Sequence, residues 1–226
     1  HGCLYVANRG NGFTKPNLEA ITNIAQSSKP VNEGIGNKGL GFRSVLQICS
    51  WPEIYSVRGA GGSGTFDGYC FRFAREPDIR RFLPPGQDLG LASEIVQRMP
   101  FWHLPVYAQD RPGLVGRFAR ERFATVVRMP LDSPEARRSV EAQLGVLCSH
   151  PRPLHLFLDR VHRIAIEGGD GRSLELLRRI ESRWDLPCGT RVERVRVGDE
   201  IYCIGTQEVP EGDFLVELEK SLALKQ

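Results

Sequence analysis

A glycine-rich stretch near the start of the chain has the composition of a phosphate-binding loop. Gly36, Gly39 and Gly41 lie close together, and the apolar pattern that follows them predicts a short helix. Glycine lets a ligand approach the backbone closely, and the first turn of a helix offers unpaired N–H groups and the positive end of the helix dipole. Lys38 would add a positive charge beside a phosphate chain. Composition alone does not decide the matter, because a tight turn before a packed helix looks the same.

A second turn with two glycines precedes this loop. Asn8-Arg9-Gly10-Asn11-Gly12 follows an apolar stretch, residues 3–7, that we expect to be a strand. Thr14 is a candidate N-cap for the next helix, and a polar segment at 26–33 separates that helix from the glycine loop. A third glycine run, 59–64, lacks the Gly-Lys-Ser/Thr ending and the following helix of a P-loop, so we expect a hairpin loop there.

Periodicity and the positions of proline and glycine predict the remaining elements. We expect strands at 51–58 and 66–73, and an irregular, proline-rich insertion at 77–116 that contains one helix at 92–98. Further along, the patterns predict a strand at 123–129, a helix from Pro134 to Leu147, a short helix at 154–161, and strands at 163–167, 174–182, 190–197, 200–206 and 214–218. Arginine and glutamate interleave in these last strands, which favours solvated cross-strand ion pairs.

The composition is that of an ordinary globular protein. The chain has 226 residues, 41% hydrophobic and 25% charged, and its net charge of +3 is too small to indicate nucleic-acid binding by itself. Six scattered cysteines without metal-ligand spacing favour free thiols in a reducing cytosol, so we expect a cytoplasmic protein. No apolar run approaches the roughly 18 residues of a membrane span. The chain begins at His1 inside an expected strand, and we expect it to be part of a longer protein.

The order of these elements resembles the GHKL ATP-binding family, which includes gyrase B, the ninety-kilodalton heat-shock chaperones, histidine kinases and MutL. The likeness is strongest to the heat-shock-like branch that contains sacsin and the plant No Vein proteins. It covers roughly residues 3–167 and is carried by four segments: ANRGNGFTKPNLEAITNIAQSSK, GIGNKGLGFRSVLQICSWPEIYS, ATVVRMPL and LHLFLDRVHRIAIE.

The resemblance implies an ATP site. Asn8 stands where the family has an aspartate that accepts a hydrogen bond from the adenine amino group; an amide oxygen accepts the same bond, but more weakly. Gly12 would admit the base to the backbone, Phe13 would pack on its face, and Thr125 would support the base-reading residue. Ser27, Ser28 and Lys29 would lie in a lid near the phosphates. The loop that wraps the phosphates would consist of Gly36, Asn37, Lys38, Gly39, Leu40, Gly41 and Phe42.

The residues of hydrolysis are not assigned by this resemblance. In the family, a helix upstream of the first strand carries a glutamate that activates water and an asparagine that holds Mg²⁺. That helix would precede His1, so the catalytic residues are unknown and ATP hydrolysis is left open. ATP with Mg²⁺ is the expected cofactor. The expected partners are ATP or ADP, further domains of the same polypeptide and, as is common in the family, a second copy in a homodimer.

The resemblance implies a two-layer α/β sandwich, the Bergerat fold, in which helices cover one face of a mixed, mainly antiparallel sheet. Residues 1–168 would form the ATP-binding domain, and 169–226 a β-rich extension that begins a middle domain. The leading interpretation is that the chain is the ATP-binding domain of a larger chaperone-like or regulatory ATPase. In such a protein, closure of the lid over ATP would drive a conformational change. Two alternatives stay open: a nucleotide-free interaction scaffold, motivated by Asn8, and a DNA-linked ATPase, motivated by arginines at 111–122 and 178–196.

Overall fold

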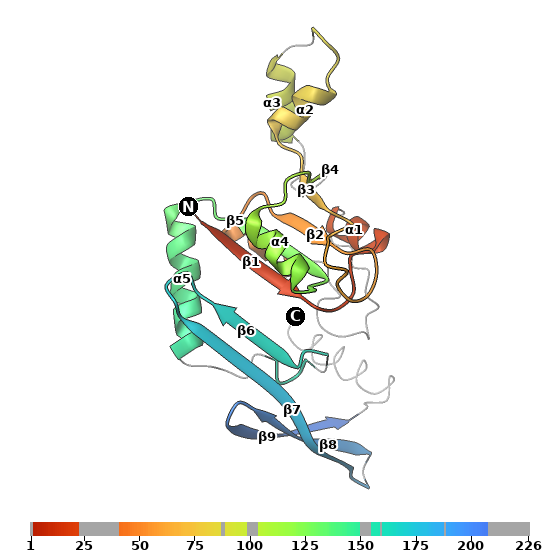
Figure 1. The fold of residues 1–226 in the computed structure, drawn as a ribbon, viewed down its shortest axis with the longest axis vertical. Coiled ribbons are helices and arrows are strands. Elements are labelled where there is room, and N and C mark those ends of the chain that lie inside the picture. Colours follow the sequence, from red (N-terminus) through yellow and green to blue (C-terminus); the bar gives the residue numbers. More distant parts are fainter. Residues whose placement is uncertain are drawn as a thin grey trace, which may run out of the picture. The chain divides into compact units, whose positions relative to one another are not determined.

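The chain forms two compact units, His1–Val140 and Glu141–Gln226, which are described separately (Figure 1). The computed structural model describes residues 2–22, 41–86, 89–98, 104–149, 155–158, 160–187 and 189–207. Within these ranges the α/β class and the β-rich C-terminal part are confirmed. No helix in the described ranges is long and apolar enough to cross a membrane.

The first unit is built on a five-stranded sheet in the order β1-β5-β2-β3-β4. Its strands are β1 (Cys3–Asn8), β2 (Glu53–Ser56), β3 (Phe71–Phe73), β4 (Pro105–Tyr107) and β5 (Thr125–Pro130). Every strand pair in the described part of this sheet is antiparallel, whereas the resemblance implied a mixed, mainly antiparallel sheet. The late strand β5 lies between β1 and β2, so the ends of three strands from distant parts of the sequence meet.

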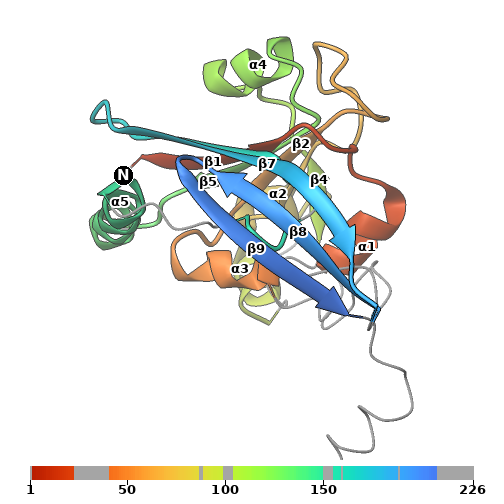
Figure 2. The ribbon, with the colours of Figure 1, turned by 90° about the horizontal axis from the view of Figure 1, so that it is seen from below.

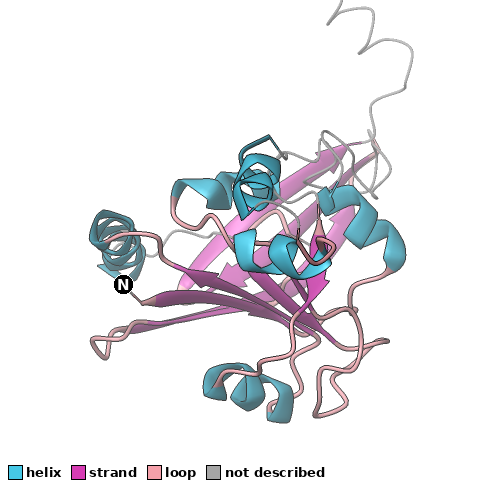
Figure 3. Ribbon diagram, turned by 90° about the horizontal axis from the view of Figure 1, so that it is seen from above, coloured by secondary structure: helices cyan, strands magenta, loops and turns pink. Residues whose placement is uncertain are grey.

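Helices cover both faces of this sheet, and the expectation of one covered face is wrong (Figure 3). Side chains alternate between the faces along each strand. Ile54 and Val127 pack with α1 (Lys15–Thr22) and the 3-10 helix η1 (Gly41–Gln47). Tyr55 and Val126 pack with α4 (Gly113–Arg120) on the opposite face. The reason is that β2 and β5 carry apolar residues at successive positions, which leaves two apolar faces to bury.

The segment 77–116 is more regular than predicted. It contains most of α2 (Glu76–Phe82), all of α3 (Leu89–Arg98) and β4, and the start of α4; the helix expected at 92–98 is confirmed as part of α3. Prolines begin or precede these elements instead of breaking them: one lies in the first turn of α2, one begins β4, and Pro112 precedes α4. Asp78 accepts the Arg75 N–H at 2.9 Å, and two hydrogen bonds from the Arg72 guanidinium hold the pKa of Asp78 at about 2.

The second unit contains a four-stranded antiparallel sheet of β6 (Arg163–Glu167), β7 (Ser173–Asp185), β8 (Thr190–Val197) and β9 (Glu200–Gln207) (Figure 2). The division between the units falls inside α5 (Pro134–Ser149). Cross-strand ion pairs are present as predicted, for example from Arg194 and Arg196 to Glu181. The expected strand at 214–218 lies outside the described residues. β6, which the sequence assigned to the ATP-binding domain ending at 168, pairs with β7 in this second sheet.

The short helix expected at 154–161 is absent from the residues described there. The Leu158 N–H bonds the His155 carbonyl, and the Val161 N–H bonds the Leu158 carbonyl, which gives consecutive turns instead of a helix. His155 is fully buried, and neither of its ring nitrogens has a hydrogen-bond partner among the described residues. Burial, followed by the positive charge of the nearby Arg178, lowers the pKa of His155 below its ordinary value.

Candidate functional site

Three strands of the first unit end in a row of short polar side chains. Asn8, the last residue of β1, lies directly opposite Thr125, the first residue of β5, and Thr125 lies opposite Ser56, the last residue of β2. Directly opposed residues of antiparallel strands project to the same side of a sheet. By alternation from Ile54 and Val127, that side is the face covered by α1 and η1. The structure therefore brings Asn8 and Thr125 together, as the resemblance implied.

Ser56 lies at the β2 end of this row, beyond Thr125, and the sequence did not single it out. It is fully buried, its Oγ accepts the Phe13 N–H at 2.6 Å, and the Thr125 Oγ1 lies 3.4 Å away. The Ser56 hydroxyl also donates to the Val57 carbonyl at 3.0 Å. A small hydroxyl residue at the end of a short strand was the only signal of it in the sequence. The register of three strands was needed to place it beside Asn8 and Thr125.

Gly12 is required by the fold itself. A Cβ at this position would lie 2.0 Å from the Val57 carbonyl oxygen, and the Gly12 N–H donates to the Gly59 carbonyl at 3.0 Å. Any side chain would therefore push the turn away from the end of β2. The glycine was predicted because it would admit an adenine base, and close backbone packing accounts for it without a ligand.

The aromatic residues of the two glycine motifs join one apolar cluster. The Phe13 ring packs against Phe71 with 6.2 Å between centroids, and Phe42 of η1 belongs to the same cluster together with Leu18 and Ile21 of α1. Phe13, directly after the first glycine motif, and Phe42, at the end of the second, are both half-buried and pack on the same face of the sheet. The short helix predicted after the glycine loop is confirmed as η1, which begins at Gly41.

Most of the predicted phosphate-binding residues lie outside the described part of the chain. These are Ser27, Ser28, Lys29, Gly36, Asn37, Lys38, Gly39 and Leu40. Their roles stay predictions. The described part of the candidate site consists of the polar row of Asn8, Thr125 and Ser56, together with Gly12, Phe13 and the start of η1.

The described row has no acid–base chemistry of its own. Asn8, Ser56 and Thr125 offer hydrogen-bond donors and acceptors but no group that titrates near neutral pH. Among the described residues no cluster of His, Cys, Asp or Glu could hold a metal ion. Burial raises the pKa of the nearby Cys49 thiol to about 11, so it stays protonated and inert. The row is therefore suited to binding, and the Mg²⁺ ligand stays a prediction.

A pocket of about 330 Å³ lies beside the end of β2 and is lined by Arg58, Asp67, Gly68 and Tyr69. A Cβ on Gly68 would lie 2.4 Å from the Val57 carbonyl oxygen, the same atom that excludes a side chain at Gly12. The pocket therefore borders the polar row, although none of the predicted site residues lines it. The sequence analysis did not identify these lining residues.

The opposite face of the same strands contains a charged cluster. Glu53 lies directly opposite Arg128, and its Oε2 accepts hydrogen bonds from the Arg128 Nη1 and the Tyr55 hydroxyl, both at 2.8 Å. Burial and the bond to Glu53 raise the pKa of Tyr55, which keeps its hydroxyl a donor. This cluster lies under α4, on the face away from Asn8, and its role is to hold β2 and β5 together.

Comparison with known proteins gives one distant likeness. The chain is 26% identical to Protein NO VEIN of Arabidopsis thaliana over 182 residues, which are 78% of this chain and 6% of that protein. The chain thus spans a small fraction of the length of that relative. No protein-family model matches the chain, and no solved structure matches it. The likeness indicates a No Vein-like relation for most of the chain.

Proposed function

We propose that the first unit binds ATP in a GHKL-type site, as part of a larger chaperone-like or regulatory ATPase. One observation carries the proposal: Asn8, Thr125 and Ser56 form a continuous polar row at one end of the sheet, on the face shared with α1 and η1. Asn8 is exposed at the edge of this row, whereas Thr125 and Ser56 are buried behind it. This order suits one side chain that meets a ligand and two that fix the neighbouring backbone, because the Thr125 hydroxyl donates to the Asn11 carbonyl and Ser56 Oγ accepts the Phe13 N–H.

In this proposal Asn8 reads the base. Its amide oxygen accepts a hydrogen bond from the adenine amino group, and the half-buried ring of Phe13 offers an apolar surface beside it. Lys38 and the N–H groups before η1 would hold the phosphates, as the resemblance implies. Lid closure by the segment with Ser27, Ser28 and Lys29, and hydrolysis, remain separate predictions of the same resemblance.

The amide of Asn8 makes base selectivity the sharpest test. An amide can also present its NH₂ group, so Asn8 can donate to the O6 acceptor of guanine, which a carboxylate cannot do. Asn8→Asp is therefore expected to tighten ATP binding and weaken GTP binding, because a charge-assisted hydrogen bond is roughly twice as strong as a neutral one. Asn8→Ala should weaken both nucleotides alike.

Isothermal titration of the chain with ATP, ADP and GTP, each with Mg²⁺, measures these effects. Lys38→Ala tests the phosphate end, and Lys15→Ala, which removes an exposed lysine of α1 that pairs with Glu19, is the matched control. We expect Lys38→Ala to weaken ATP binding and Lys15→Ala to leave it unchanged. No binding of ATP or ADP by a folded chain, whichever residue occupies position 8, would contradict the proposal.

A nucleotide-free interaction scaffold is the second candidate. It is favoured by one observation: Ser56 is already engaged by Phe13 and Val57, and Gly12 is explained by contact with Val57, so this end of the site is complete without a ligand. The titration above separates the two functions. A scaffold would show no heat of nucleotide binding and no rise in melting temperature at saturating ATP.

A further inference from the structure

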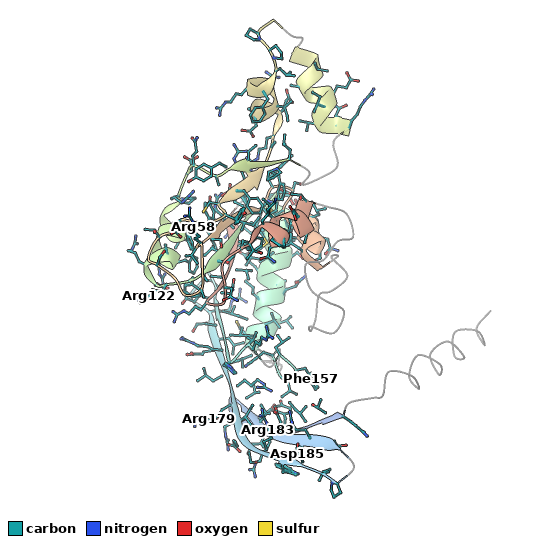
Figure 4. All side chains as sticks on the ribbon, turned by 90° about the vertical axis from the view of Figure 1, so that its right-hand side faces the viewer. Arg58, Arg122, Phe157, Arg179, Arg183 and Asp185 are labelled. Carbon is teal, nitrogen blue, oxygen red and sulfur yellow. The ribbon has the colours of Figure 1, made fainter. Side chains whose placement is uncertain are left out.

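The ends of β1, β2 and β5 continue into three arginines on one rim of the first unit. Arg9 follows Asn8, Arg122 precedes Phe123, and Arg58 follows Val57. The Ala124 N–H donates to the Asn8 carbonyl at 2.8 Å, and the Val57 N–H donates to the Ala124 carbonyl at 2.9 Å. The segment with Arg122 therefore runs between the segments with Arg9 and Arg58. We call Arg9, Arg58 and Arg122 the arginine rim; Figure 4 labels its Arg58 and Arg122.

An open glycine hairpin lies against this rim. Residues 59–64 continue from Arg58, and Gly62 packs so tightly on Arg122 that a Cβ there would lie 2.4 Å from the Arg122 carbonyl carbon. A Cβ on Gly59, Gly61 or Gly64 would meet no atom within 4 Å. The hairpin is thus held at Gly62, at the Gly59 carbonyl, which accepts the Gly12 N–H, and at Ala60, which forms a bridge with Asn11. At Gly61 and Gly64 the backbone is open to close approach by a ligand.

The charges of the rim are not balanced by carboxylates. All three arginines are exposed, and within the described part of the chain none of their guanidinium groups forms an ion pair. The guanidinium of Arg9 lies over the Phe123 ring, 4.7 Å from its centroid. The Asp67 carboxylate accepts the Arg58 backbone N–H at 3.1 Å, and among the described residues it forms no ion pair with the Arg58 guanidinium. By contrast, Arg117 of α4 is paired with Glu121.

Arg122 occupies a backbone conformation that favours glycine. Its φ is 61°, and it follows the C-terminus of α4, where the Phe123 N–H bonds the Phe118 carbonyl and the Arg122 N–H bonds the Ala119 carbonyl. A glycine at this position would be less strained. The backbone conformation therefore does not account for an arginine at this position, and its exposed guanidinium needs another explanation.

We propose that the arginine rim binds the phosphate backbone of nucleic acid without reading its sequence. Guanidinium forks match phosphate oxygens in geometry and charge, and the open glycine backbone admits a chain of phosphates. A protein partner is less suited, because protein interfaces are anchored by buried apolar and aromatic groups, and the large apolar side chains exposed in the described ranges do not belong to the rim. Arg9 covers the Phe123 ring, so this ring offers no face on which a base could stack, and the contacts of the rim would be to phosphates.

Fluorescence anisotropy with the 226-residue chain and a labelled oligothymidylate of about 20 nucleotides tests the proposal. Three phosphate contacts predict that the logarithm of affinity falls with the logarithm of salt concentration with a slope of about −2. The variant with Arg9→Gln, Arg58→Gln and Arg122→Gln should lose most of this slope. A control with Arg80→Gln, Arg81→Gln and Arg98→Gln removes the same charge from α2 and α3 and should keep it. Equal losses in both variants would overturn the proposal.

Arg122→Gly separates binding from folding. It relieves the positive φ, so the melting temperature should not fall, while oligothymidylate affinity should drop severalfold. Unchanged affinity in this variant would refute the role of the rim. Stronger binding of a polyglutamate peptide of matched charge would also refute it, because it would identify an acidic protein segment as the occupant. Asn8→Ala should keep oligothymidylate binding, which distinguishes this surface from the nucleotide site.

Discussion

The two faces of the first sheet bury polar groups in different ways. On the α4 face, Glu53 and Arg128 form an ion pair with little exposure, and the Tyr55 hydroxyl bonds the same carboxylate. On the α1–η1 face, the buried polar groups are the neutral hydroxyls of Ser56 and Thr125, and the row ends in an exposed amide. Removing one partner of a buried ion pair strongly destabilises a folded protein, whereas removing a neutral buried hydroxyl costs less stability.

This contrast indicates a division of labour within the same strands. Residues at alternating positions of β2 serve opposite faces. Glu53 and Tyr55 therefore fix the packing of β2 on β5, while Ser56 forms the end of the row next to Phe13. The two faces should therefore respond differently to mutation. Variants of the α4 face should act on stability, and variants of the row should act on stability only modestly and on nucleotide binding as well.

The largest effect is expected from Glu53→Gln. This change leaves the Arg128 guanidinium partly buried without a counter-charge, and we expect it to lower the free energy of unfolding by about 3 kcal/mol. Urea denaturation followed by circular dichroism measures it. In the double variant Glu53→Gln with Arg128→Met, most of the loss should be recovered. A double variant as unstable as the single one would show that the ion pair is not the cause.

Gly12→Ala should be next in size. The added Cβ would collide with the Val57 carbonyl, so the turn must shift, at a cost of about 2 kcal/mol. Gly59→Ala is the matched control, because its Cβ would meet nothing within 4 Å, and it should change the free energy of unfolding by less than about 0.5 kcal/mol. If both alanines have the same effect, Gly12 is not held by the end of β2.

Ser56→Ala should have the smallest effect on stability of the three. It leaves the Phe13 N–H without its acceptor, which is expected to cost about 1 kcal/mol. Ser63→Ala, in the exposed hairpin, is the control and should be neutral. Because Ser56 contacts both Phe13 and Thr125 of the proposed site, we expect Ser56→Ala also to weaken ATP binding. A loss of stability as large as that of Glu53→Gln would remove the contrast between the two faces.

The sequence predicted local structure better than it predicted which residues meet. The strand before Asn8, the strand with Thr125, and the tail hairpins were found because each has its own apolar period and turn residues. Helices α2 and α4 were missed because prolines at their starts were interpreted as signs of irregular chain. Ser56 was missed because its importance comes only from register with a strand 69 residues away.

The same limit explains why the sequence did not predict how the helices are arranged on the two faces of the sheet. The alternation that divides Ile54 from Tyr55, and Val126 from Val127, was present in the sequence, but both residues of each pair are apolar. A strand that is apolar on both sides gives no sign of which helix covers which face. Family resemblance supplied the residues Asn8 and Thr125, and the geometry of the sheet was needed to place them together.

His155 makes the second unit less stable at acidic pH. Its burial, then the charge of Arg178 and then that of His162, lower the pKa of His155 in the folded state below the ordinary value of 6.5. Glu193 forms an ion pair with Arg178. Below about pH 6.5 the unfolded chain therefore binds a proton at His155 that the folded chain does not bind. The free energy of unfolding is highest above this pH and declines as the pH falls below it. His155→Phe should remove part of this decline, measured as unfolding free energy at pH 7.5 and pH 5.5. A protein that contains this unit would then be selectively weakened in an acidified compartment.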